Sequence, residues 1–181
     1  MGRIKQVVAA LKLKSVFAER RYKLYNIAYA WTHDAALADD LVQETIYKAL
    51  KKAASLHDIE TVDAWLYRIL LNCWHDYLRT KGRNVELYDM DDERLEQDEL
   101  YQQAQIVKRV RASIQQLPLP LREVVTLADL SGCSYAEIAD IVEIPIGTVM
   151  SRLFRARKLL KKSLLDFGGD QQTRPVLRSV K

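Results

Sequence analysis

The polar side chains with the clearest chemistry lie within residues 134–162, near the end of the 181-residue chain. Arginine can pair with guanine edges or phosphates, and serine and threonine hydroxyls can bond to either. The candidate contacts to duplex DNA are Ser134, Tyr135, Thr148, Met150, Ser151, Arg152, Phe154, Arg155 and Lys158. The alternative is an amphipathic helix whose polar face is simply solvated.

The same segment has the pattern of a helix-turn-helix. Ser134 and Glu137 form a capping box that opens a short helix, and Pro145 suits the first turn of a longer one. At ~100° per residue, one narrow arc of the longer helix is apolar, and hydroxyls, one aromatic ring and several cations lie opposite. That arc holds Ile146, Val149, Leu153, Ala156 and Leu160. We therefore predict that the longer helix packs on Ile138 and Ile141 and presents its polar side to DNA.

A second polar stripe lies on an otherwise apolar helix predicted from about residue 62 to 83. The stripe consists of Arg68, Asn72, Asp76, Arg79 and Arg83, which lie within about 80° of one another. Contacts to phosphates and single-stranded bases fit there, with Arg79 and Arg83 the stronger candidates. In the alternative interpretation, i,i+4 and i,i+3 pairs inside the stripe only stabilise the helix.

A third candidate surface lies on the helix predicted just before it. Leu37 and Leu41 share an arc with Asp40 and Glu44 that we expect to face outward. Exposed leucines beside carboxylates suit a partner helix. The alternative is that the leucines pack on the first helix of the chain.

Helical periodicity runs through almost the whole chain, and alternating strand patterns are absent. Helices are predicted over about 16–31, 35–54, 62–83, 103–116, 121–130, 135–142 and 145–165. The predicted fold class is all-α, with two small helical domains joined by an acidic linker. The segments are an N-terminal extension (1–14), a first domain (15–84), the linker (85–103), a helix-turn-helix domain (104–165) and a flexible tail (166–181).

Charge is distributed unevenly along the chain. Residues 1–84 carry 14 Lys/Arg against 9 Asp/Glu, residues 85–103 carry 1 against 8, and residues 104–181 carry 13 against 7. Two basic segments therefore flank an acidic one, although the formal net charge is only +4. Basic surfaces of this kind suit a polyanion such as nucleic acid, and solvated basic helices are the alternative.

Three segments carry motifs in a characteristic order. Asp39-Asp-Leu-Val-Gln-Glu-Thr45 comes first, Ala64-Trp-Leu-Tyr-Arg-Ile69 follows, and the run from Ser134 to Arg157 ends in Ser-Arg-Leu-Phe-Arg-Ala-Arg. In this order they resemble the polymerase-docking helix, the promoter-melting helix and the promoter-reading end of extracytoplasmic-function (ECF) sigma factors of bacterial RNA polymerase. The resemblance covers roughly residues 15–165.

The resemblance implies the roles of both domains. The first would be a region-2-like domain that contacts core RNA polymerase and the −10 promoter element. The second would be a region-4-like domain that reads the −35 element through the candidate contacts between residues 134 and 158. The −10 contacts would be Arg68, Asn72, Arg79 and Arg83, and the core polymerase contacts would be Leu37, Asp40, Leu41, Gln43 and Glu44. A regulatory anti-sigma factor is the further partner that the resemblance implies.

Two positions depart from the family pattern. Glu143 stands in the turn of the helix-turn-helix where glycine is common in the family. If this residue needs a positive φ, a side chain there costs roughly 1 kcal/mol. A slightly different turn is the alternative. Met150 stands where lysine or arginine is common, so one backbone or base contact is expected to be weaker.

The sequence gives no indication of catalysis, of a cofactor or of a metal site. Nucleophile-elbow, P-loop and HExxH motifs are absent, and Cys73 and His75 are two residues apart, so on a helix their side chains diverge. No run approaches the ~18 apolar residues of a membrane span. We therefore expect a cytoplasmic, non-enzymatic protein without membrane insertion.

Two other functions stay open at this point. One is a sigma-like decoy that binds an anti-sigma protein, although the retained Arg152, Arg155 and Arg157 argue against it. The other is a helix-turn-helix regulator that acts without core polymerase. Such a regulator would need a ligand or dimerisation domain, and residues 1–84 show neither a sensor pattern nor a heptad seam.

Overall fold

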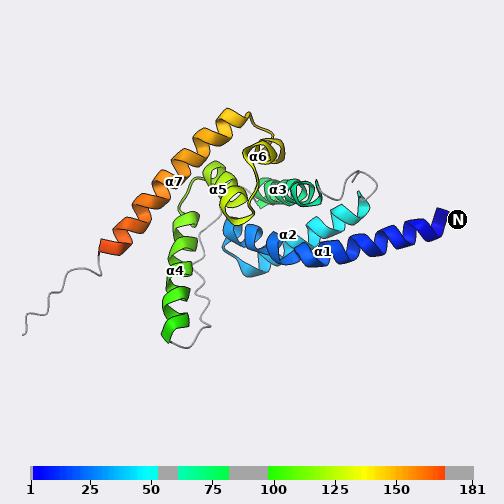
Figure 1. Cartoon of the computed structure of the whole chain (residues 1–181), viewed down its shortest axis with the longest axis horizontal. Helices are drawn as coiled ribbons and strands as arrows, with labels where there is room; N and C mark the ends of the chain where they lie inside the picture. The colour runs from blue at the N-terminus through cyan, green and yellow to red at the C-terminus, as the bar shows by residue number, and fades with distance from the viewer. Residues whose placement is uncertain (1, 53–60, 82–97, 170–181) are drawn as a thin grey trace, which may run out of the picture.

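The computed structural model describes residues 2–52, 61–81 and 98–169, with side chains described for residues 15–52, 61–81 and 106–165. Within these ranges the chain is helical and contains no strand, which confirms the predicted all-α class. The helices are α1 (Gly2–Thr32), α2 (Ala35–Lys51), α3 (Val62–Lys81), α4 (Asp98–Gln115), α5 (Leu119–Val125), the π-helix η3 (Thr126–Leu130), α6 (Tyr135–Val142) and α7 (Ile146–Gly169) (Figure 1).

Helices α1, α2 and α3 pack together and form what we name the N-terminal unit. Their apolar faces meet at fully buried side chains such as Leu24, Trp31, Val42 and Leu70. Asp34 is the N-cap of α2, as its position before the periodic segment predicts, and its side chain accepts a hydrogen bond of 3.0 Å from the backbone N–H of Leu37.

Helices α4, α5, η3, α6 and α7 form what we name the C-terminal unit. Its core contains Leu127, Ile138, Val149 and Leu153, all at most 1% exposed. The i→i+5 geometry of η3 was not predicted. The segment ends at Leu130, and Gly132, two residues further on, has φ +71 and lets the chain turn into α6.

Three helix starts differ from those predicted. Helix α1 begins at Gly2, so most of the predicted extension is helical, and its sequence up to residue 15 has no proline to break a helix. Helix α4 begins at Asp98, inside the predicted linker. Helix α5 begins at Leu119, because Pro120 occupies the first turn, where no backbone N–H is needed. Residues 82–97 and 170–181, which contain most of the predicted linker and tail, lie outside the described residues.

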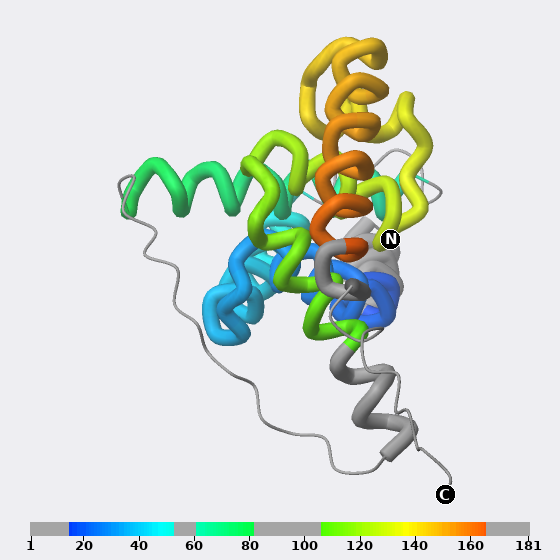
Figure 2. The backbone as a smooth tube through the Cα atoms, turned by 90° about the vertical axis from the view of Figure 1, so that its left-hand side faces the viewer, coloured from blue at the N-terminus to red at the C-terminus, as the bar shows by residue number. Residues whose placement is uncertain are grey.

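The two units pack against each other and share one buried cluster. Helix α6 packs on α3, and α5 and η3 pack on α1. Both views show this arrangement, with the α5–α6 segment against the N-terminal unit and α7 reaching past it (Figures 1 and 2). This contact between the units was not predicted from the sequence.

Arg122 of α5 is the central polar group of this junction. Its guanidinium donates hydrogen bonds to the Trp31 carbonyl at 2.9 Å, to the Leu117 carbonyl at 3.1 Å and to the Gln115 carbonyl. Burial lowers its pKa from the usual value. Because Trp31 lies in the last turn of α1, Arg122 satisfies a carbonyl that the helix itself leaves without a partner. Burial beside Arg122 and Arg111 also lowers the pKa of His33 to about 4.

The sequence left the backbone of the turn between α6 and α7 open, and the structure gives Glu143 a positive φ. Glu143 is left-handed, with φ 57 and ψ 46, and its backbone N–H bonds to the Ala139 carbonyl. The neighbouring Ile144 N–H bonds to the same carbonyl at 3.1 Å. The turn therefore closes α6 well, at the cost of a side chain in a region where glycine is favoured.

Replacing Glu143 by glycine is expected to raise the free energy of unfolding by about 0.5–1 kcal/mol, because the left-handed backbone is then unstrained. Urea denaturation of the full chain measures the change. The matched control is Gly132→Ala: a Cβ at Gly132 meets no atom within 4 Å, so only the backbone is affected there. This control is expected to lose about 1 kcal/mol, and a loss in Glu143→Gly would contradict the strain argument.

Candidate nucleic-acid interface

The helix-turn-helix is formed by α6 and α7, and its local signals act as the sequence predicts. Ser134 caps α6: its Oγ accepts a hydrogen bond of 3.3 Å from the Glu137 N–H, and the Glu137 carboxylate accepts one of 2.7 Å from the Ser134 N–H. The Ser134 hydroxyl also donates to the Glu137 carboxylate at 2.7 Å, and this bond, together with the one from the Ser134 N–H, holds the pKa of Glu137 below its usual value. The capping box fixes where α6 begins.

The apolar arc of α7 faces α6 and the rest of the C-terminal unit. Val149, Leu153 and Ala156 are at most 1% exposed and pack with the buried Ile138 and Ile141 of α6. Ile146 was predicted in the same arc but is 48% exposed. It is the first residue of α7, and the buried part of the arc begins one turn later, at Val149.

The opposite side of α7 is open to solvent. Met150 is 51% and Phe154 is 71% exposed, and Ser151, Arg155 and Lys158 are exposed too. Thr148 and Arg152 are partly buried at the edges of this side, and Ser134 and Tyr135 are exposed at the start of α6. The structure thus brings the nine predicted contacts onto α7 and the start of α6. We name the exposed α7 side chains Met150, Ser151, Phe154, Arg155 and Lys158 the recognition face.

Arg157 has a role that the sequence did not predict. Its guanidinium forms an ion pair with Asp129 at 2.7 Å, and Nη1 lies 3.5 Å from the Tyr135 hydroxyl. These contacts tie α7 to the end of η3 and the start of α6, so Arg157 positions the recognition face. No spacing rule finds a pair 28 residues apart.

The predicted polar stripe on α3 is divided between two environments. Asn72 and Arg79 are exposed, with the Arg79 side chain 76% exposed. Arg68, although exposed, donates a hydrogen bond to the Asp140 carbonyl of α6. Arg83 lies outside the described residues. The Arg79 end of the stripe is therefore exposed to solvent, and the Arg68 end contacts the C-terminal unit.

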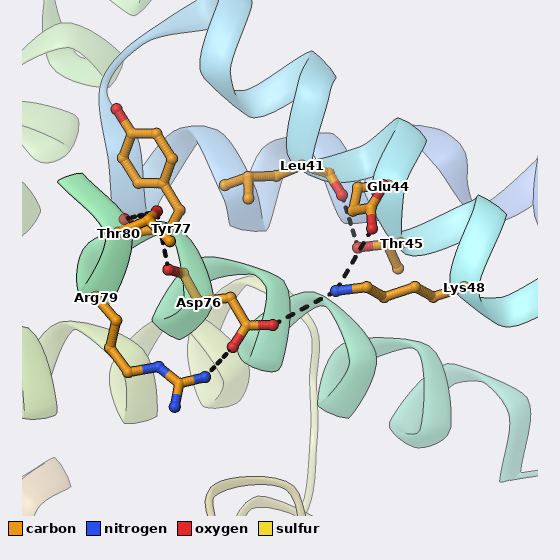
Figure 3. Close-up of polar contacts among 8 residues, drawn as sticks. All are labelled: Leu41, Glu44, Thr45, Lys48, Asp76, Tyr77, Arg79 and Thr80. Carbon is orange, nitrogen blue, oxygen red and sulfur yellow. Dashed lines mark hydrogen bonds and ion pairs between the residues drawn. The ribbon is translucent and has the colours of Figure 1, made fainter.

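A polar network joins the middle of the stripe to α2 (Figure 3). The Lys48 ammonium lies 3.5 Å from both the Glu44 and the Asp76 carboxylates. Asp76 also accepts a hydrogen bond from Arg79, which holds the pKa of Asp76 below its usual value. The i,i+3 pair that was the alternative for this stripe is therefore present, and it leaves Asn72 and the remaining N–H groups of Arg79 available.

The α2 surface differs in part from the prediction. Asp40, Gln43 and Glu44 are exposed, but Leu41 is only 4% exposed and Leu37 is partly buried against the core. The predicted outward position of Leu41 is wrong, because α1 and α3 both pack on α2. The exposed part of this surface is polar and mostly acidic.

The described residues contain no group of three or more His, Cys, Asp or Glu side chains that could hold a metal ion. Cys73 and Cys133 are both free, and burial raises the pKa of the Cys133 thiol to about 11. No helix among the described residues is long and apolar enough to cross a bilayer.

Two family models match the chain, one in each unit. Sigma-70 region 2 matches residues 16–84, and Sigma-70, region 4 matches residues 108–160. The chain therefore has the two helical regions of a bacterial sigma factor.

Two relatives show to which group of sigma factors the chain belongs. The RNA polymerase sigma-H factor of Pseudomonas aeruginosa is 33% identical over 157 residues, which cover 80% of this chain and 81% of the relative. The ECF RNA polymerase sigma-E factor of Escherichia coli K12 is 34% identical over 152 residues, which cover 77% of this chain and 75% of the relative. The chain belongs to the ECF family of RNA polymerase sigma factors.

Two similar structures were solved with anti-sigma partners or partner domains. The sigma factor RpoE in complex with the anti-sigma factor NepR from Bartonella quintana aligns with a TM-score of 0.70 and 27% identity, over 84% of this chain and 96% of that one. CnrH in complex with the cytosolic domain of CnrY aligns with a TM-score of 0.61 and 26% identity, over 91% and 96%.

Proposed function

We propose that this chain binds core RNA polymerase and directs it to promoters through two separate DNA contacts. The recognition face of α7 carries the −35 contact, with Thr148, Arg152, Ser134 and Tyr135 at its edges. The observation that carries this assignment is the exposed row of Ser151, Arg155 and Lys158 on a helix whose opposite side is buried. A helix docked in this way can enter a major groove without losing its packing.

The α3 stripe carries the −10 contact. Arg68, Asn72, Arg79 and Arg83 supply cations and one amide, which suit phosphates and unpaired bases. Asp76 has a structural part in this stripe, since it orients Arg79 and Lys48.

The exposed Asp40, Gln43 and Glu44 of α2 carry the contact to core polymerase. Leu37 is partly buried and adds to it at the edge, whereas Leu41 acts through the packing of α2. Carboxylates on this surface suit a basic partner.

The chain is also expected to bind an anti-sigma factor. Both solved relatives described above were captured with an anti-sigma factor or a partner domain, and this chain aligns with nearly the whole of each. The protein acts in the cytoplasm as an initiation factor and not as an enzyme.

The deciding experiment is run-off transcription with bacterial core RNA polymerase on a pool of templates with varied −35 and −10 sequences. Initiation that depends on the chain is expected, and sequencing the transcripts gives the promoter. The Asp40→Asn/Glu44→Gln variant is expected to lose both core binding and transcripts. The control is Asp129→Asn, a substitution outside α2, which is expected to keep core binding. Core binding without transcripts would point to a decoy, and no core binding would contradict the proposed function.

A further inference from the structure

Side-chain hydrogen bonds of the described residues join the N-terminal and C-terminal units at three places. Arg122 donates to the Trp31 carbonyl, Arg68 donates to the Asp140 carbonyl, and His75 Nε2 lies 2.7 Å from Glu123 Oε1. The first two use backbone carbonyls. The third joins two titratable side chains, and the Glu123 side chain is only 5% exposed while that of His75 is 43% exposed.

This arrangement conflicts with simultaneous binding of both promoter elements. Elements centred near −10 and −35 are about 25 base pairs apart, which is ~85 Å of duplex at ~3.4 Å per base pair. In the structure, Arg68 of the −10 stripe is within hydrogen-bond distance of α6, the helix that precedes α7 with its recognition face. The units must therefore separate before both contacts form, an argument that rests on the proposed function.

We propose that the His75–Glu123 pair is the latch of a closed, autoinhibited state, in which the helix-turn-helix unit occupies the Arg68 end of the −10 stripe. A carboxylate as buried as Glu123 needs a charged or hydrogen-bonding partner, and His75 supplies it across the junction. When the units separate, the carboxylate gains water and the latch is released.

Other charged groups lie around the pair. Asp76 and Arg79 flank His75 on α3, Lys48 of α2 reaches Asp76, and Arg122 is adjacent to Glu123 on α5. The charges that α1 and α6 bring to α3 lie nearer its start: Arg20 and Lys23 pair with Asp63, and Asp140 lies beside Arg68. The group in direct contact with the imidazole is Glu123.

The latch is sensitive to pH. The hydrogen bond with Glu123 raises the pKa of His75 above its ordinary value of 6.5. The closed state therefore binds a proton that the open state releases, so closing is favoured as the pH falls. The contribution is complete below about pH 6.5, the open-state pKa, and is lost as the pH rises through the higher pKa of the closed state.

Electron–electron distance measurements on the full chain test the latch without DNA. Spin labels on noncanonical amino acids replace Tyr22 on α1 and Leu165 on α7, which are 74% and 63% exposed. One narrow distance is expected at about pH 6, and a second, longer population at about pH 8.5, where the open-state histidine, with its ordinary pKa of about 6.5, is neutral. An unchanged distribution would overturn the proposal.

His75→Gln and Glu123→Gln each keep a hydrogen-bonding amide but remove the charged pair, and the second keeps the shape of the buried carboxyl. Both are expected to show a severalfold larger open population at about pH 6 and little change with pH. The control is Asp140→Asn, which changes a charge at the same junction but keeps the carbonyl that Arg68 uses, so it should respond to pH like the parent.

A parental pH response in both glutamine variants would refute the latch. Loss of the response in both variants together with failed run-off transcription would uphold the latch and refute the proposed function.

Discussion

Replacing Arg122 by methionine is expected to lower the free energy of unfolding by about 2–4 kcal/mol. Methionine fills the space of the side chain but leaves the carbonyls of Trp31, Gln115 and Leu117 without their donor. Buried acceptors without a partner cost ~1–3 kcal/mol each, and partial access of water to some of them reduces the sum. Chemical denaturation at 25 °C, followed by circular dichroism, measures the loss.

Two variants separate this effect from a general loss of charge. Arg122→Lys keeps the charge but not the planar set of N–H donors, so it is expected to recover less than half of the loss. Arg111→Met removes an exposed arginine whose guanidinium lies 5.1 Å from the Tyr29 ring centre. It should cost less than ~1 kcal/mol. Equal losses in Arg111→Met and Arg122→Met would show that Arg122 does not act through the three carbonyls.

Arg155→Ala is expected to weaken binding to the −35 element by ~1–3 kcal/mol, or about 5- to 150-fold. Arg155 lies exposed on the recognition face, where a guanidinium can bond to a guanine edge. The loss is measured as the Kd of the full chain with core polymerase for a −35 duplex, at fixed salt, against the same duplex with one base pair changed.

The pattern of loss distinguishes a base contact from a phosphate contact. If Arg155 reads a base, Arg155→Ala binds the cognate and the altered duplex nearly alike. If it contacts a phosphate, affinity falls evenly on all sequences and the salt dependence becomes shallower. The control is Lys161→Ala, about four turns from the start of α7, beyond the turns that contact base edges in a helix-turn-helix, and it should leave discrimination between the duplexes unchanged.

The features that the sequence predicted well are local ones. The capping box of Ser134 and Glu137 and the Asp34 N-cap each depend on a few neighbouring residues. Because backbone geometry couples such residues directly, their spacing alone indicates the structure. The division into apolar and polar sides of α7 follows from the same regularity.

The features that the sequence did not predict depend on partners far along the chain. Leu41 was expected outside because an arc on one helix does not reveal that α1 and α3 both cover it. Arg157 finds Asp129 across 28 residues, and His75 finds Glu123 across 48. Ion pairs of this kind leave no periodicity, so the junction of the two units could not be predicted. The functional roles of the residues on α2, α3 and α7 remain predictions.

The bond from Arg122 to Trp31 also bears on how the chain is made. The two residues are 91 positions apart, so α1 is synthesised long before its last-turn carbonyl can acquire this donor. Domains generally fold as they emerge, with the N-terminal part first. In the nascent N-terminal unit, the last turn of α1 is therefore still exposed to water. The unit reaches its final stability only after α5 has left the ribosome and docked.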